Sequence, residues 1–219
     1  MGNAIAMDNG RQPSGESRGN ALQAAQREAT RDRLVEGAIR VFTRKGYAAS
    51  VVADVLKEAQ VSRASFYAHF SSMQALVEEI ADRFAPVWQP YYAQLARMPG
   101  KTREQLRDWC GQMVRFYREN EAICVILAHA VLLDQEIYGK TARYQEVLID
   151  LLAEGEPRLA HLRGDADARM RVGLVLSQLD RSCYYLGVRQ WPKDPAAGVA
   201  AMADLLHHFL HGEMERGGA

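Results

Sequence analysis

The sequence has few of the features that mark secreted, membrane-spanning or metal-binding proteins. It contains 3 cysteines in 219 residues, Cys110, Cys124 and Cys183, in no paired spacing and odd in number. That usage favours a reduced, cytoplasmic compartment. No run of about 18 apolar residues occurs, so we expect no membrane span and no membrane partner. Residues 1–20 lack the apolar core of a secretory signal and are predicted to be a disordered tail.

An excess of either charge is also absent, because 27 Lys and Arg balance 27 Asp and Glu. The distribution is uneven. Residues 1–72 carry 10 basic and 7 acidic side chains, a difference of +3, and the remainder carries 17 and 20, a difference of −3. A mildly basic first third on a mildly acidic remainder is a weak indication that the N-terminal part meets a polyanion.

Alternating β-branched runs bounded by turns are missing as well, so no strand is predicted. Apolar residues instead recur at helical spacing, as in the stripe of Leu34, Val35, Ala38, Ile39 and Phe42. We therefore predict an all-α fold. After the helix that carries this stripe, further helices are expected over 51–59, 63–69, 73–97, 102–119, 121–134, 137–162 (interrupted near 155–157), 165–190 and 195–211.

Helix-end signals support these boundaries. Gly46 is suited to the left-handed turn after a helix, and Ser50, Ser62 and either of two serines before Met73 are placed as N-caps. Pro86 and Pro90 are expected to kink or break the long helix that follows, and 121–134 is apolar enough to be buried throughout. The predicted division is a tail (1–20), a three-helix domain (21–72) and a six-helix domain (73–219).

An ordered set of motifs lies in residues 46–76, GYAASVVADVLKEAQVSRASFYAHFSSMQAL. It resembles the helix-turn-helix of the TetR family of transcriptional regulators. The matching parts are the pair Gly46-Tyr47, the capping position Ser50, the turn Val61-Ser62-Arg63 and the aromatic cluster Phe66-Tyr67-Ala68-His69-Phe70. The likeness covers about 31–80, whereas the remaining residues match the family only in length and helical character.

A short helix that starts at Ser62 can enter the major groove of DNA, where base edges present distinct donors and acceptors. Arg63 in its first turn can bond to a guanine edge or a phosphate, and the Tyr67 hydroxyl lies one turn later. Each position also has a simpler interpretation, as a cap, a solvated arginine, a packed tyrosine or a structural histidine. The predicted DNA-binding residues are Ser50, Ser62, Arg63, Ala64, Ser65, Tyr67 and His69.

Four positions depart from the family pattern. Gln60 stands where the turn usually has glycine, so a non-glycine residue is expected at positive φ. Leu56 replaces a small residue at the expected helix contact. Ala53 and Met73 lack the polar side chains that often face DNA. These changes leave the predicted fold intact and put the strength of the phosphate contacts in question.

The resemblance also implies a homodimer joined through the last two long helices, which places two recognition helices about one DNA turn apart. In 165–190 the apolar residues follow a heptad-like spacing, and 195–211 carries further apolar residues. Ordinary intramolecular core is the alternative interpretation of this spacing. The predicted interface residues are Val172, Leu176, Leu179, Cys183, Leu186, Met202, Leu206 and Phe209.

A small-molecule effector bound among the later helices is a further implication of the resemblance. Aromatic side chains with polar tips suit a largely apolar or aromatic ligand, although each is also compatible with plain core. The candidates are Trp88, Tyr92, Trp109, Met113, Phe116, Tyr117, His129 and Tyr184.

Other functions have less support. His207 and His211 are one turn apart but lack a third ligand, so no metal and no cofactor are predicted. Isolated cysteines on apolar helices are usually packing residues rather than redox sensors. We find no nucleophile motif, carboxylate pair or glycine-rich phosphate loop, so no enzyme is predicted. The main hypothesis is a ligand-released repressor on a palindromic operator, and the alternative is a non-DNA interaction module with a degenerate helix-turn-helix.

Overall fold

The computed structural model describes residues 15–191 and 194–217, and every regular element in these ranges is helical. The elements are α1 (Gly15–Lys45), α2 (Val52–Ala59), α3 (Arg63–His69), α4 (Met73–Arg97), α5 (Arg103–Glu119), α6 (Glu121–Leu133), α7 (Gln135–Gly155), the 3₁₀ segment η1 (Pro157–Arg163), α8 (Ala166–Cys183), the π-helical turn η2 (Tyr184–Val188) and α9 (Ala196–Gly217). The prediction of an all-helical fold, with three N-terminal helices followed by six more, is confirmed.

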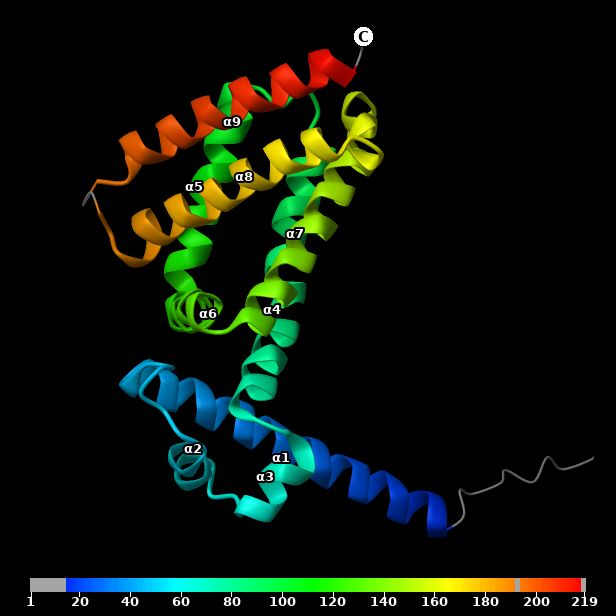
Figure 1. The fold of residues 1–219 in the computed structure, drawn as a ribbon, viewed down its shortest axis with the longest axis vertical. Helices are drawn as coiled ribbons and strands as arrows, with labels where there is room; N and C mark the ends of the chain where they lie inside the picture. The colour runs from blue at the N-terminus through cyan, green and yellow to red at the C-terminus, as the bar shows by residue number, and fades with distance from the viewer. Residues whose placement is uncertain (1–14, 192–193, 218–219) are drawn as a thin grey trace, which may run out of the picture.

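The helices form two tiers in Figure 1. The lower tier, which we call the head, consists of residues 15–72 with α1–α3. The upper tier, the body, consists of residues 73–217 with α4–α9. Helices α4 and α7 pack along each other, and α4 continues from the body into the head. The head core also takes Leu76 and Ile80 from α4 and Ile126 from α6, so the predicted boundary between residues 72 and 73 stays a prediction.

The stripe predicted for α1 faces the head core. Leu34, Ala38 and Phe42 are buried against Val55 of α2 and Phe66 of α3, as the helical spacing requires. Helix α1 begins at Gly15, within the predicted tail 1–20, and residues 1–14 of that tail lie outside the described residues. Alanine, glutamine and arginine have high helix propensity, which explains a helix that starts well before its buried face.

The structure differs from three further expectations about these helices, concerning a break, a burial and a boundary. Helix α4 continues through Pro86 and Pro90, so the break that was one of the two expected outcomes does not occur; both prolines are exposed while the opposite face stays packed on the rest of the molecule. Helix α6 is buried on one side only, and its last two residues, Leu132 and Leu133, are exposed. Helix α9 extends to Gly217, six residues beyond the predicted end. Tertiary packing outweighs local signals in each case.

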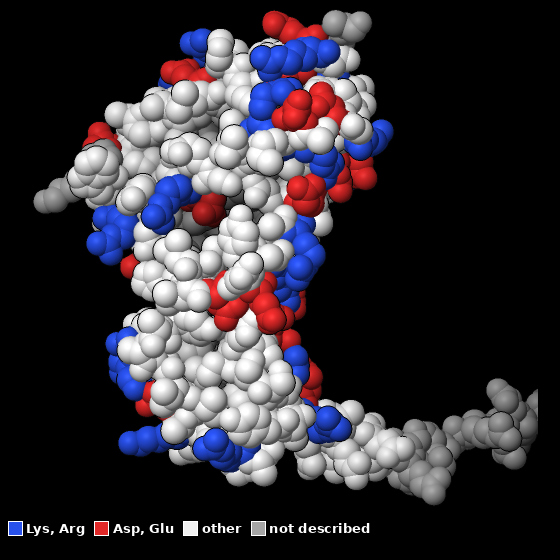
Figure 2. All heavy atoms as spheres, viewed as in Figure 1, with Lys and Arg blue, Asp and Glu red and all other residues white. Residues whose placement is uncertain are grey.

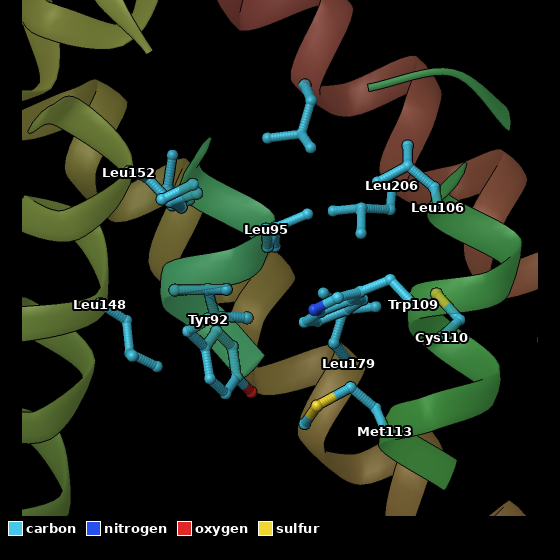
Figure 3. Packing of buried hydrophobic residues seen from close by; sticks show 14 of the residues in the cluster. Tyr92, Leu95, Leu106, Trp109, Cys110, Met113, Leu148, Leu152, Leu179 and Leu206 are labelled. Carbon is cyan, nitrogen blue, oxygen red and sulfur yellow. The ribbon is translucent and has the colours of Figure 1, made fainter. Parts of the chain in front are cut away.

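The core of the body is a layer of aliphatic and aromatic side chains between α4, α5, α7, α8 and α9. Figure 3 shows Trp109 of α5 at its centre, with Tyr92 and Leu95 of α4 on one side and Leu179 of α8 beside it. The Trp109 indole N–H donates a hydrogen bond to the Tyr91 carbonyl at 2.8 Å, so its polar atom is satisfied inside the core. These contacts fix the positions of α5 and α8 relative to α4.

Among the described residues, no single helix is both long and apolar enough to cross a membrane. Only α6 and α7 taken together reach that length and composition, and they are bent by 116° at their junction.

Candidate nucleic-acid interface and body recess

The turn between α2 and α3 has the geometry that the motif predicts. Gln60 adopts φ 53° and ψ 48°, the left-handed conformation, and its N–H donates to the Leu56 carbonyl. The Ser62 hydroxyl accepts a hydrogen bond from the Ser65 N–H at 3.1 Å, and α3 begins at Arg63. The predicted cap at Ser62 and the predicted positive φ at Gln60 are both confirmed.

Helix α3 has one buried face and one open face. Phe66 and Phe70 are buried in the head core, whereas Arg63, Ala64 and Tyr67 are exposed and Ser65 is half-buried. The Tyr67 ring is 48% exposed and packs edge-on against Phe66 at 5.2 Å between centroids. The Arg63 guanidinium lies 5.6 Å from the Tyr67 ring centroid, so the tyrosine both packs on the head and supports the arginine at the open face.

The C-terminal end of α3 is tied to α1 and α4 through Arg31. Its guanidinium donates to the His69 carbonyl at 3.2 Å and to Glu79 at 2.5 Å, and it stacks over Phe70 at 4.5 Å. The hydrogen bonds from Arg31 lower the pKa of Glu79 to about 2. His69 is half-buried, and its described contact is made by its backbone. Arg31 of α1 therefore holds the C-terminal end of α3 in place next to α4.

Ser50 does not cap α2, so that prediction is wrong. Its hydroxyl donates to the Gly46 carbonyl at 2.6 Å, and Val51 occupies the N-cap position. The Asp54 carboxylate accepts from the Val51 N–H at 3.1 Å and pairs with Lys45 at 2.6 Å. An acidic side chain thus satisfies the start of α2, a role that the sequence assigned to the Ser50 hydroxyl.

The four departures from the family pattern are accommodated without disrupting the head. Ala53 is exposed, and Met73 and Leu56 pack half-buried on the head core. The close approach of α1 and α2 occurs at Gly37 instead of Leu56, because a Cβ at Gly37 would lie 3.0 Å from the Ala59 Cβ. Figure 2 shows basic groups along the lower edge of the molecule, where α2 and α3 lie in Figure 1.

Most of the predicted ligand residues pack in one aromatic cluster of the body. Tyr92, Trp109, Met113 and Phe116 are buried, with the Tyr92 and Trp109 rings 5.7 Å apart. The structure sets His129 apart from this cluster, on the exposed side of α6. The half-buried candidates are Trp88, Tyr117 and Tyr184.

Asp180 is the feature of this region that sequence reasoning missed. Its side chain is open to solvent, yet the protein around it desolvates the carboxylate and raises its pKa. The Tyr117 hydroxyl of α5 donates to its Oδ1. A solvent-open but desolvated carboxylate lies in a recess, and Figure 2 shows a hollow in the body with acidic atoms within it. The sequence signal that could have identified Asp180 is its position, because an acidic residue stands there one helical turn after Leu176 and next to Leu179, which is buried.

The predicted dimer interface stays a prediction, and most of its side chains already pack within the protomer. Its members on α8 and η2 and the first two on α9 are buried in the protomer's own core, and Phe209 packs half-buried against it. The heptad-like spacing arises because one face of each helix covers the body core. The exposed apolar side chains of these helices are Met170 and Leu174 on α8 and Leu205 on α9.

The three cysteines are buried, and the histidine pair is in ring contact. Burial raises the pKa of the Cys110 and Cys124 thiols to about 12, and burial raises that of Cys183 well above its ordinary value. A protonated, buried thiol is a poor nucleophile, which disfavours redox sensing. The His207 and His211 rings lie 4.2 Å apart, and within the described ranges no group of three His, Cys, Asp or Glu is placed to hold a metal.

In the head, α3 is capped by Ser62 and packs on the head core through Phe66 and Phe70. Together with α2 and the turn between them, it forms a helix-turn-helix. Residues 34–80 match the family described as bacterial regulatory proteins, tetR family. The chain is 27% identical over 101 residues to the uncharacterized HTH-type transcriptional regulator YerO of Bacillus subtilis, which covers 44% of this chain and 34% of YerO. It is 38% identical over 58 residues to the HTH-type transcriptional repressor DhaR of a Mycobacterium species, covering 26% of this chain and 29% of DhaR. The chain thus spans about a third of the length of these relatives.

Solved structures extend the likeness to the body. The TetR family regulator PfmR from Thermus thermophilus is 26% identical with a TM-score of 0.55, covering 80% of this chain and 94% of PfmR. A TetR-family protein from Syntrophomonas wolfei shares the fold with a TM-score of 0.62 at 14% identity, covering 84% and 95% of the two chains. Residues 34–80 therefore match the TetR-family helix-turn-helix, and the described chain as a whole is similar in fold to solved TetR-family regulators.

Proposed function

We propose that this protein is a DNA-binding transcriptional repressor that reads a palindromic operator as a homodimer and is released by a small molecule bound in the body. The observation that carries the proposal is the open face of α3. Arg63 and Tyr67 are exposed and mutually supported there, on a helix whose other face is anchored by buried Phe66. A short helix so presented fits the major groove.

The test is the binding of genomic DNA fragments at physiological salt, comparing the wild type with Arg63→Ala. We expect preferred fragments to share a palindrome and Arg63→Ala to cost about 1–3 kcal/mol of binding free energy. Arg107→Ala, which removes an exposed arginine on α5 in the body, is the matched control and should bind as the wild type does. Absence of any preferred fragment, or wild-type binding by Arg63→Ala, would contradict the assignment.

The alternative of a non-DNA interaction module predicts a different salt response. Phosphate contacts release counterions, so the logarithm of the binding constant falls linearly with the logarithm of salt concentration. A slope near zero would favour the alternative. The head offers a limited set of free basic groups, because Glu58 and Asp54 pair with Arg40, Arg44 and Lys45. We therefore expect a measurable but shallow slope.

The proposed dimer uses the exposed apolar side chains of α8 and α9. Leu174 is 64% and Leu205 is 67% exposed in the single chain, and exposed leucines on adjacent helices of a regulator suit a subunit interface. Leu174→Glu and Leu205→Glu should each convert dimers to monomers in analytical ultracentrifugation. Leu132→Glu, at a similarly exposed leucine of α6, is the control that should leave the association unchanged.

Release by a ligand requires that the body move the head. Ile126 and Ala130 of α6 pack into the same core as Leu34 of α1, while the ion pair between Arg31 and Glu79 connects α4 to the end of α3. We infer that a ligand that shifts α4 or α6 changes the spacing of the two recognition helices. The proposed effector residues are those of the aromatic cluster around Tyr92 and Tyr117.

A further inference from the structure

The recess of the body contains one carboxylate among aromatic side chains from several helices. Asp180 projects from α8, accepts from the Tyr117 hydroxyl of α5, and is open to solvent. Its negative charge also contributes to the raised pKa of Tyr92 on α4 and Cys124 on α6, after the larger effect of burial. The hydrogen bond from Tyr117 holds the carboxylate against α5, beside the aromatic cluster to which Tyr117 belongs.

Among the described residues this carboxylate has no ion-pair partner, and the only charge that acts to lower its pKa is the more distant one of Arg181. Within residues 15–191 and 194–217, no Lys, Arg or His nitrogen forms an ion pair with Asp180, although eighteen such pairs occur elsewhere. The neighbouring Arg181 is instead placed over two rings, with its guanidinium 5.7 Å from the Tyr184 centroid and 5.1 Å from that of Tyr185. A desolvated carboxylate without a cationic partner is unfavourable, so a bound cation would be stabilising.

The aromatic cluster that adjoins Tyr117 is suited to the apolar part of a cation. Phe116 lies 5.0 Å from the Tyr91 ring and 5.9 Å from the Tyr117 ring, and Trp88 lies 5.9 Å from Tyr92. Figure 3 shows the Tyr92 ring turned away from Leu95 and Leu152. Aromatic faces attract ammonium groups through their quadrupoles, and a carboxylate beside them adds charge complementarity. Neither feature favours an anionic ligand.

We propose that the recess binds an organic cation, a protonated amine or quaternary ammonium attached to an aromatic or alkyl group, with Asp180 as its counter-charge and Tyr117 as the residue that orients the carboxylate. This inference rests on the proposed function, because it assigns a chemical class to the effector. It also narrows the sequence-based expectation of a largely apolar or aromatic ligand by adding one positive charge. A neutral hydrogen-bonding ligand is the competing occupant.

The experiment compares benzylamine, protonated at pH 7, with benzyl alcohol, a neutral molecule of nearly the same shape, by calorimetric titration of the full-length protein without DNA. We expect benzylamine to bind wild type about tenfold or more tightly than the alcohol, a difference of about 1.4 kcal/mol. Asp180→Asn should abolish that preference and leave the affinity for benzyl alcohol unchanged. Asp167→Asn, at an exposed acid in the first turn of α8, should preserve it.

Equal binding of the two probes by wild type, or binding of neither, overturns the proposal, and this comparison does not depend on any variant folding. A preference that survives in folded Asp180→Asn also overturns it, because the charge would then be recognised elsewhere. DNA binding is measured separately on the same preparations. Sequence-specific DNA binding without cation preference refutes only the cation site, and cation preference without DNA binding refutes only the proposed repressor.

Discussion

The head and the body present their functional side chains in opposite ways. In the head, the predicted Arg63 and Tyr67 are on the open face of a short helix, and the buried face needs only Phe66 and Phe70. In the body, most predicted ligand residues are part of the core, and the acid open to solvent, Asp180, was not predicted. The residues of a DNA-reading helix can be predicted because they lie in one short stretch of sequence. The residues of a recess between helices cannot, because tertiary contacts bring them together.

The two regions nevertheless share one mechanical connection. The head core is completed by Leu76 and Ile80 of α4, and the body core by Tyr92 and Leu95 of the same helix. Helix α4 therefore belongs to both. Mutations that weaken one core and not the other test how far the regions are independent, and the following predictions run from the largest expected effect to the smallest.

Phe66→Ala should have the largest effect. Phe66 is fully buried under α3, and removal of such a ring costs about 3–5 kcal/mol, including the cavity it leaves. We expect loss of DNA binding and faster hydrogen exchange in α1–α3, measured by mass spectrometry, while exchange in α5, α8 and α9 is unchanged. An equal loss of hydrogen-exchange protection in head and body would contradict the view that the two cores are separate.

Trp109→Ala is the counterpart in the body and the control for Phe66→Ala. Trp109 is buried at the centre of the body core, so the cost should also be about 3–5 kcal/mol. Here hydrogen exchange should accelerate in α5, α8 and α9 and benzylamine binding should disappear. Protection of α2 and α3 should persist, because their core residues do not include Trp109.

The fold was predictable where the local signals agreed with one another. Apolar spacing, a serine at position 62 and a glycine at position 46 all predicted the same three helices of the head. In the structure Ser62 caps α3 and Gly46 adopts φ 80°. Local signals were insufficient where distant contacts decide, as at Pro86 in α4, where the expected break does not occur because the opposite face of the helix is packed. The cap at Ser50 failed because Asp54 pairs with Lys45 across the turn and takes the capping role.

The candidate sites show the same division. The positions of Arg63 and Tyr67 followed from ordered residues within one short stretch. The dimer stripe that includes Leu176 and Leu206 had the right spacing for an interface but faces its own core, because apolar periodicity does not reveal which neighbour covers a helix. Asp180 is significant only because Tyr117, 63 residues away in sequence, donates to it.

Glu79→Gln should have an intermediate effect. The change removes the charge partner of Arg31, whose guanidinium holds the end of α3. Allowing for partial solvent screening, we expect a loss of about 1–2 kcal/mol at pH 7 and weaker DNA binding. Urea unfolding and DNA titration measure the two effects. Glu36→Gln, at an exposed acid whose pair with Arg40 spans 3.8 Å, should change neither.

The pH dependence gives this prediction a second readout. The Glu79 pKa falls from an ordinary 4.5 to about 2 in the folded protein, chiefly through the hydrogen bond from Arg31. Because the folded pKa is the lower one, the stabilisation is complete above about 4.5 and is lost as pH falls towards 2. The difference in unfolding free energy between wild type and Glu79→Gln should shrink across that window. A difference that stays constant would exclude the ion pair as its cause.

Gln60→Gly should have the smallest effect, and its sign is the informative part. Gln60 is at φ 53° in the turn before α3, where a side chain is strained and glycine is not. Arg33 donates to the carbonyls of Ala59 and Gln60 at 2.7 and 2.8 Å, so the turn geometry is braced and should persist. We expect a gain of up to about 1 kcal/mol in unfolding free energy, with unchanged DNA binding. Lys57→Gly, inside α2, should instead lose about 1 kcal/mol. Equal losses from both substitutions would show that the left-handed turn carries no strain.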